Sequence, residues 1–168
     1  MVKTPIDRIC LENDILCSAC QRKVDSGEIS EMDVKVSRVL NRLEKRFKSL
    51  KDATFIKSYE TTKRIIILTG KGDARKVVGK GGSVVKELSK KFQKGIQVFE
   101  VKDSLEDYVK ELVPPDMIIG VNRVFTKDGS YYKVILRGKD RKRMKVSRGE
   151  LEEVLGKLSG EGVKVVFE

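Results

Sequence analysis

The chain has 168 residues, of which 39% are hydrophobic and 36% charged, and this balance indicates a folded protein of one ordinary domain or two small ones. No apolar run approaches membrane-spanning length and the N-terminus lacks the apolar core of a signal peptide, so we expect a cytoplasmic protein without a membrane partner. The absence of histidine removes the commonest general base, which argues against an enzyme.

The formal net charge of +11 is concentrated in two stretches of the chain. Residues 71–95 hold eight Lys and Arg against two acidic residues, and residues 137–148 hold seven against one. Such a cluster attracts polyanions, although it is often no more than a solvated surface. We expect the first cluster to bind a polyanion because it surrounds a glycine-rich loop. For the second cluster both interpretations stay open.

The N-terminal segment, residues 1–29, contains all three cysteines of the chain: Cys10, Cys17 and Cys20. The last two form a Cys-x-x-Cys pair, which grips a zinc ion from a tight turn, and residues 6–24 predict a small hairpin similar to half of a zinc ribbon. A closed zinc site needs a fourth ligand, which would be a water, a group from another chain or one of three carboxylates: Asp7, Asp14 and Asp25. The alternatives are reduced thiols or a disulfide.

The next elements are a long helix and two strands. Ser30 is a typical helix N-cap, and apolar residues then recur at helical spacing as far as Leu50. Residues 53–60 predict a strand. Residues 64–69 form a β-branched run, which predicts a second strand that is buried along its whole length.

A helical hairpin and a third strand follow. Asp73 is placed to cap a short helix over residues 74–78, and the apolar spacing from Val84 to Phe92 predicts a second helix. Between these helices stands Gly79-Lys80-Gly81-Gly82, a Gly-x-x-Gly loop. Residues 96–101 then predict a strand.

This order of elements, together with the loop, resembles the type II KH domain, a nucleic-acid-binding module. The resemblance implies that the loop clamps the backbone of about four nucleotides of single-stranded RNA. Glycine suits that role because a Cβ would hold the phosphodiester chain away from the peptide backbone. The helix that begins after the loop also favours phosphate at its N-terminus. The alternative is a turn between two helices that binds no ligand, in which the glycines serve only to make the turn tight.

We expect the RNA contacts to come from the loop itself and from three groups of residues around it. Four cations would neutralise phosphates, three valines would form a groove floor and the core behind it, and a glutamine on the third strand would read base edges. The expected RNA-binding residues are Arg75, Lys76, Val77, Val78, Gly79, Lys80, Gly81, Gly82, Val85, Lys86 and Gln97.

Residues 103–168 predict a second unit of the same kind. A short helix over residues 104–113 precedes two strands joined by a hairpin turn at Asp128-Gly129, and a further helix and strand end the chain. The rival interpretation is an unrelated meander with its third strand over residues 141–146.

When the sequence is aligned with itself at an offset of 68 residues, the last strand of the chain matches the strand that ends the first unit. The same shift places Ser147-Arg148-Gly149-Glu150 on the Gly-x-x-Gly loop, so that both defining glycines are absent. Ser147 and Glu150 instead fit a helix capping box. The second unit is therefore predicted to be a degenerate KH-like module that has lost the clamp.

The predicted fold class is α+β, with a cysteine knuckle over residues 1–29 and tandem KH-like α/β sandwiches over residues 30–102 and 103–168. The tandem arrangement with one clamp resembles the archaeal NusA-like factors of transcription elongation and termination. The resemblance implies a non-catalytic protein that binds single-stranded RNA and meets RNA polymerase. The alternatives are a ribosome-associated or ribosome-assembly protein and a protein-interaction adaptor. A nuclease is the weakest alternative, because the sequence offers no carboxylate cluster and no complete metal site.

Overall fold

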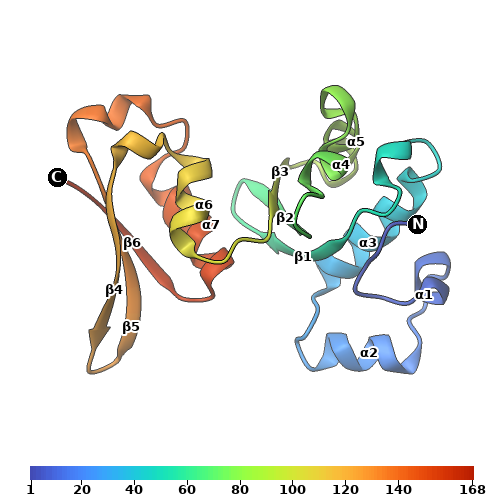
Figure 1. Ribbon diagram of the computed structural model, residues 1–168. Coiled ribbons are helices and arrows are strands. Elements are labelled where there is room, and N and C mark those ends of the chain that lie inside the picture. The colour runs from blue at the N-terminus through green and yellow to red at the C-terminus, as the bar shows by residue number, and fades with distance from the viewer. The chain divides into compact units, whose positions relative to one another are not determined.

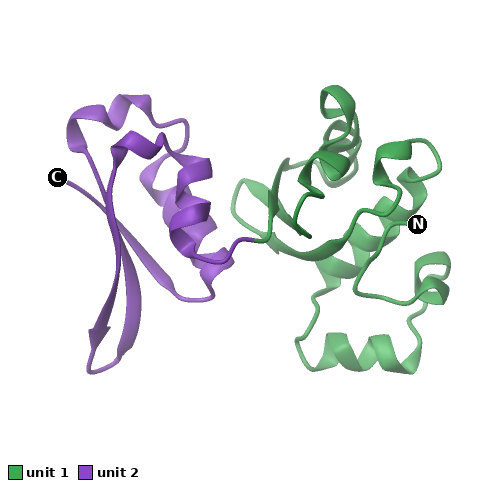
Figure 2. Cartoon of the chain, in the orientation of Figure 1, with its two compact units in different colours: residues 1–101 green, residues 102–168 purple.

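In a computed structural model that describes all 168 residues, the chain folds into two compact units, residues 1–101 and 102–168 (Figures 1 and 2). Each unit combines helices with its own three-stranded sheet. The predicted α+β class is therefore confirmed, with two KH-like α/β units and a cysteine cluster near the N-terminus. None of the helices combines the length and the apolar character needed to cross a membrane.

The first unit opens with two short helices, α1 (Arg8–Glu12) and α2 (Ser18–Asp25), so the predicted hairpin over residues 6–24 is wrong. Helices of this length are not stable on their own in water, and they form here because they pack. Their apolar side chains share a small core with the start of the next helix. The buried members of this core are Ile6, Cys10, Leu11, Cys20, Ile29 and Val34.

Helix α3 (Glu31–Leu43) follows, with a full capping box between Ser30 and Asp33 at its N-terminus. It ends before the apolar periodicity does, since that pattern continues through a turn into a short 3-10 helix, Lys48–Leu50. Strands β1 (Phe55–Glu60) and β2 (Arg64–Thr69) then form an antiparallel pair.

Two helices and a strand complete the first unit. These are α4 (Ala74–Val78), α5 (Ser83–Phe92) and β3 (Gly95–Glu100), which runs parallel to β2. The sheet order is β1-β2-β3, and the side chains on one of its faces share a core with residues of α3, α4 and α5. That core holds the helical hairpin, and with it the Gly-x-x-Gly loop, against the sheet.

The second unit repeats this plan. Helix α6 (Leu105–Leu112) precedes the antiparallel strands β4 (Ile118–Thr126) and β5 (Gly129–Leu136). Helix α7 (Arg148–Ser159) and strand β6 (Gly162–Phe167), parallel to β5, complete it. The sheet order β4-β5-β6 matches that of the first unit.

Between β5 and α7 the chain forms a 3-10 helix, Gly138–Arg143, and no strand. The rival meander, with a third strand over residues 141–146, is therefore wrong. The final strand, β6, takes the third place in the sheet instead.

The two sheets also share one register. Arg64 pairs with Gly95 in the first, and Tyr131 pairs with Gly162 in the second, so each residue of β5 and β6 stands 67 positions after its counterpart. The predicted shift of 68 is thus wrong by one residue. A slip of one position would point every side chain to the opposite face of the sheet. With the observed shift, the loop residues 79–82 correspond to Val146-Ser147-Arg148-Gly149.

Candidate nucleic-acid interface

The loop between α4 and α5 depends on three glycines with positive φ. Gly79, Gly81 and Gly82 have φ values of +79°, +64° and +77°, a region that residues with a side chain rarely adopt. The chain therefore turns between the two helices in a conformation for which glycine is the natural residue.

The glycines differ in what surrounds them. A Cβ on Gly79 would lie 2.7 Å from the Val84 side chain and 2.9 Å from the Val84 nitrogen, so this glycine allows the two helices to approach closely. A Cβ on Gly81 or Gly82 would meet nothing within 4 Å. Both positions therefore have open space where a side chain would stand, and Gly81 is exposed while Gly82 is half-buried.

Helix α5 begins directly after the loop, at Ser83. Gly82 occupies the N-cap position and has no side chain to accept a hydrogen bond from the first N–H groups of the helix. The Ser83 N–H bonds instead to the Lys80 carbonyl, and the start of α5 places the positive end of the helix dipole next to the loop.

Three of the four predicted phosphate-binding cations are exposed around the loop and make no ion pair: Arg75, Lys80 and Lys86. The fourth, Lys76, is half-buried, and its Nζ lies 3.1 Å from Oδ1 of Asp73. The charge of Lys76 is thus partly neutralised within the protein. Its carbonyl accepts a hydrogen bond of 3.0 Å from the Ser49 hydroxyl, which ties α4 to the preceding 3-10 helix.

Asp73 was predicted to cap α4, but its side chain makes no capping hydrogen bond. Its Oδ2 instead accepts from the backbone N–H of Thr54 at 3.0 Å, which joins the start of α4 to the chain before β1. Burial raises the pKa of Asp73, but the hydrogen bonds from Lys76 and Thr54 outweigh this and hold that pKa below its ordinary value.

The valines near the loop divide into core and surface residues. Val77 is fully buried, as is Val84 across the helix pair, and both belong to the core of the first unit. Val78 and Val85 are half-buried. Only Val78 and Val85 are therefore partly accessible to a ligand beside the loop.

Gln97 is not brought together with the loop. Its neighbours on β3, Ile96 and Val98, pack against the helix-covered core, so the alternation of side chains along a strand places Gln97 on the other face. There its Oε1 accepts a hydrogen bond of 2.9 Å from Arg64 Nη1.

The cysteines form a separate cluster in the N-terminal segment. The sulfurs of Cys10, Cys17 and Cys20 all lie within 4.8 Å of one another, and no disulfide joins them. Burial raises the pKa of Cys20 to about 12, whereas the hydrogen bond from the Cys20 backbone N–H lowers the pKa of Cys17. Three thiol groups at this spacing are suited to hold a metal ion.

The corresponding corner of the second unit has a different construction. Val146 is buried where Gly79 stands in the first unit. Ser147 caps α7, its Oγ accepting from the Glu150 N–H at 3.2 Å, so one of the two hydrogen bonds of the predicted capping box is present. Gly149 lies inside α7 and has no positive φ.

The basic cluster of the second unit is partly engaged within the protein. Arg143 donates two hydrogen bonds to Asp116, of 2.7 and 3.0 Å, and these hold the pKa of that carboxyl below its ordinary value. Arg141 lies over the Phe167 ring, 4.5 Å from its centroid. These two arginines thus have partners in their own unit.

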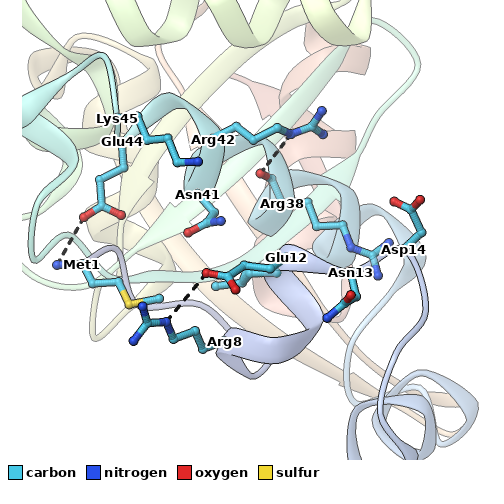
Figure 3. A pocket seen from close by; sticks show the side chains of 11 residues that line it. Met1, Arg8, Glu12, Asn13, Asp14, Arg38, Asn41, Arg42, Glu44 and Lys45 are labelled. Carbon is cyan, nitrogen blue, oxygen red and sulfur yellow. Dashed lines mark hydrogen bonds and ion pairs between the residues drawn. The ribbon is translucent and has the colours of Figure 1, made fainter.

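A hollow of about 610 Å³ lies between α1 and α3 (Figure 3). It is lined by charged side chains of both signs, among them the ion pair of Arg8 with Glu12 at 3.8 Å. None of the predicted RNA-binding residues lines it.

No family model matches the chain. Over 69 residues, or 41% of its length, the chain is 30% identical to a Methanococcus vannielii protein named probable transcription termination protein NusA. The match spans 40% of that relative. The crystal structure of APE1850 matches with a TM-score of 0.57 and 24% sequence identity, over 78% of this chain and 96% of that one. The chain thus shares the fold of APE1850 and is similar over part of its length to a NusA protein.

Proposed function

We propose that this chain is a non-catalytic protein that binds single-stranded RNA through a type II KH domain and acts as a NusA-like factor of transcription elongation or termination. The observation that carries the proposal is the open space beside Gly81 and Gly82 where side chains would stand, with three exposed cations around it that make no ion pair.

In the proposed contact, the phosphodiester chain lies against Gly81 and Gly82, where a strand can approach the main chain without meeting side chains. Lys80, Arg75 and Lys86 neutralise its phosphates, and the positive end of the α5 dipole adds to the attraction. The bases of the strand extend past the half-buried side chains next to the loop. Gln97 has no part in this contact because it lies on the opposite face of β3.

The transcription role is supported by the partial similarity to a protein named as a NusA. RNA polymerase is the partner that such a role requires. A KH-like unit that holds the nascent RNA would keep the factor close to the polymerase while the RNA is made.

The RNA contact is tested by the double variant Lys80→Asp with Gly81→Asp. We expect its affinity for a single-stranded RNA oligonucleotide to fall by at least about 10- to 100-fold, because charge-assisted contacts worth about 1.5–3 kcal/mol are lost. For the unmodified protein, neutralisation of about three phosphates predicts a slope near −2 for log affinity against log salt.

The matched control is Lys35→Asp with Gly27→Asp. It makes the same change in charge, and Gly27, like Gly81, has positive φ and open space around it. The control should retain its affinity for RNA. An unchanged affinity in the loop variant, or an equal loss in the control, would contradict the proposed contact.

The transcription role is tested by purifying the tagged chain from cells and identifying the molecules that copurify with it. RNA polymerase should be recovered, and recovery with ribosomal particles alone would favour the ribosome-associated alternative. Function that survives the loop substitutions in vivo would point to a protein-interaction adaptor.

A further inference from the structure

The three sulfurs of the cysteine cluster share one pattern of hydrogen bonding. Each sulfur accepts a hydrogen bond from one backbone N–H: Cys10 from that of Cys17 at 3.2 Å, Cys17 from that of Cys20 at 3.4 Å, and Cys20 from that of Asp7 at 3.4 Å. Thiols are weak acceptors, whereas sulfurs that bind a metal ion regularly accept hydrogen bonds from N–H groups around the site, which orient them.

Asp7 stands beside one of the three cysteines. It occupies the N-cap position of α1, where an aspartate usually accepts from the first N–H groups of the helix, yet its side chain makes no capping bond. Its Oδ2 lies instead 3.5 Å from the sulfur of Cys17. The carboxylate therefore points to the cysteines and away from the helix that it precedes.

The distances among the sulfurs, and from Asp7 to Cys17, can be compared with those around one tetrahedral ion. With zinc–sulfur and zinc–oxygen bonds of about 2.3 and 2.1 Å, two sulfurs on one ion are about 3.8 Å apart, and a sulfur and an oxygen about 3.6 Å. The sulfurs here lie within 4.8 Å of one another, and the oxygen and Cys17 sulfur are 3.5 Å apart. The group of ligand atoms within 4.8 Å of one another comprises the three sulfurs and not the Asp7 oxygen, so the side chains of Asp7 and of the cysteines would have to rotate as the ion binds.

We propose that one zinc ion is bound by Cys10, Cys17, Cys20 and Asp7 and that it stabilises the fold of the N-terminal segment. The segment has only a small core and two short helices, and a metal ion is the usual means of stabilising so little buried surface. The ion joins both helices, since Cys10 belongs to α1 and Cys20 to α2.

The site is also attached to the rest of the first unit. Arg38, on α3, donates from Nε to the carbonyl of Cys10 at 3.1 Å. Lys23 donates from Nζ to the carbonyl of Pro5 at 3.2 Å, which holds the chain just before Asp7. Loss of zinc should therefore loosen α1 and α2 while the sheet of this unit persists, because that sheet has a separate core.

The test measures zinc in the full chain, purified under reducing conditions without chelator. One zinc ion per chain is expected, and cobalt added to the stripped protein should give the visible absorption of a tetrahedral site. Hydrogen exchange after stripping should accelerate in α1 and α2 but not in β2. A chain that is isolated without metal and binds neither added zinc nor cobalt would overturn the site.

The role of Asp7 is tested by competition for zinc with a chromophoric chelator. Asp7→Asn should lose at least about 10-fold in zinc affinity, whereas the controls Asp14→Asn and Asp25→Asn should retain it. Asp7→Cys, which supplies a fourth thiolate, should bind zinc at least as tightly as the unchanged chain. Equal affinities for Asp7→Asn and the unchanged chain would remove Asp7 from the ligand set, as would a loss of affinity in Asp7→Cys.

Discussion

The two units of this protein have the same sheet topology and register but differ at the corner between their paired helical segments. In the first unit, the loop has three positive-φ glycines, and there is open space where side chains would stand at residues 81 and 82. In the second unit, a buried Val146 and a serine-capped helix occupy the corresponding positions. The fold therefore forms without an exposed glycine corner, and the open loop of the first unit is better explained by what contacts it from outside.

The cores of the units show the opposite behaviour. Several pairs of counterparts at the shift of 67 residues are fully buried in both units. Examples are Val84 with Leu151, Leu88 with Leu155, and Ile67 with Val134. Apolar contacts have thus been kept where the helices pack on the sheet, while the surface corner has changed.

The largest effect that we expect concerns the aspartates in the first turns of α3 and α6. Asp33 is fully buried and accepts from the Ser58 N–H and hydroxyl, each at 2.6 Å, and from the Ser30 N–H at 2.8 Å. Asp33→Ala would leave these donors unpaired in the interior. We expect a loss of about 3–5 kcal/mol in the free energy of unfolding of the first unit, measured by hydrogen exchange of β2 amides.

The control is Asp107→Ala in the second unit. Asp107 holds the same place relative to Ser104, but its side chain lies near the surface and bonds with that serine. Asp107→Ala should lower the free energy of unfolding of the second unit by about 0.5–1 kcal/mol, measured by hydrogen exchange of β5 amides. Equal losses in the two variants would show that the buried network around Asp33 is not what anchors α3 to β1.

A smaller loss of stability is expected when a residue of the loop in the first unit is replaced by its counterpart in the second. Gly79→Val puts a branched side chain against the Val84 nitrogen and adds strain from the positive φ. We expect it to destabilise the first unit by about 2–4 kcal/mol in urea unfolding. Gly81→Ala, where nothing lies within 4 Å, should cost only about 1 kcal/mol. Similar costs at both positions would mean that the helices can separate to admit a side chain.

The smallest effects are expected at the glycine that both units retain. Gly82 has a φ of +77°, so Gly82→Ala should destabilise the protein by about 1 kcal/mol. Gly149 is helical with open space around it, so Gly149→Ala should stabilise by about 0.5 kcal/mol. The two variants should shift the midpoint of thermal unfolding in opposite directions. A shift in the same direction would indicate that the two corners are more alike than their backbones suggest.

Much of the fold could be predicted because it depends on local patterns. The β-branched run of β2 and the helical spacing of α5 are each apparent within a dozen residues. The short helices α1 and α2 could not be predicted in this way, because their stability comes from contacts with α3. Strand β3 carries apolar residues on both faces, so its sequence does not show which face the helices cover. The face on which Gln97 lies could therefore not be predicted.

The order of the helices and strands after Ser30 could be predicted from the residues alone, as could the glycine loop between two helices. Only the tertiary structure decided the shift of 67 residues between the units, the face on which Gln97 lies and the position of Asp7 beside the cysteines. Backbone propensities and side-chain periodicity act between near neighbours along the chain. The register of distant strands and the meeting of ligands from separate turns depend instead on how whole elements pack.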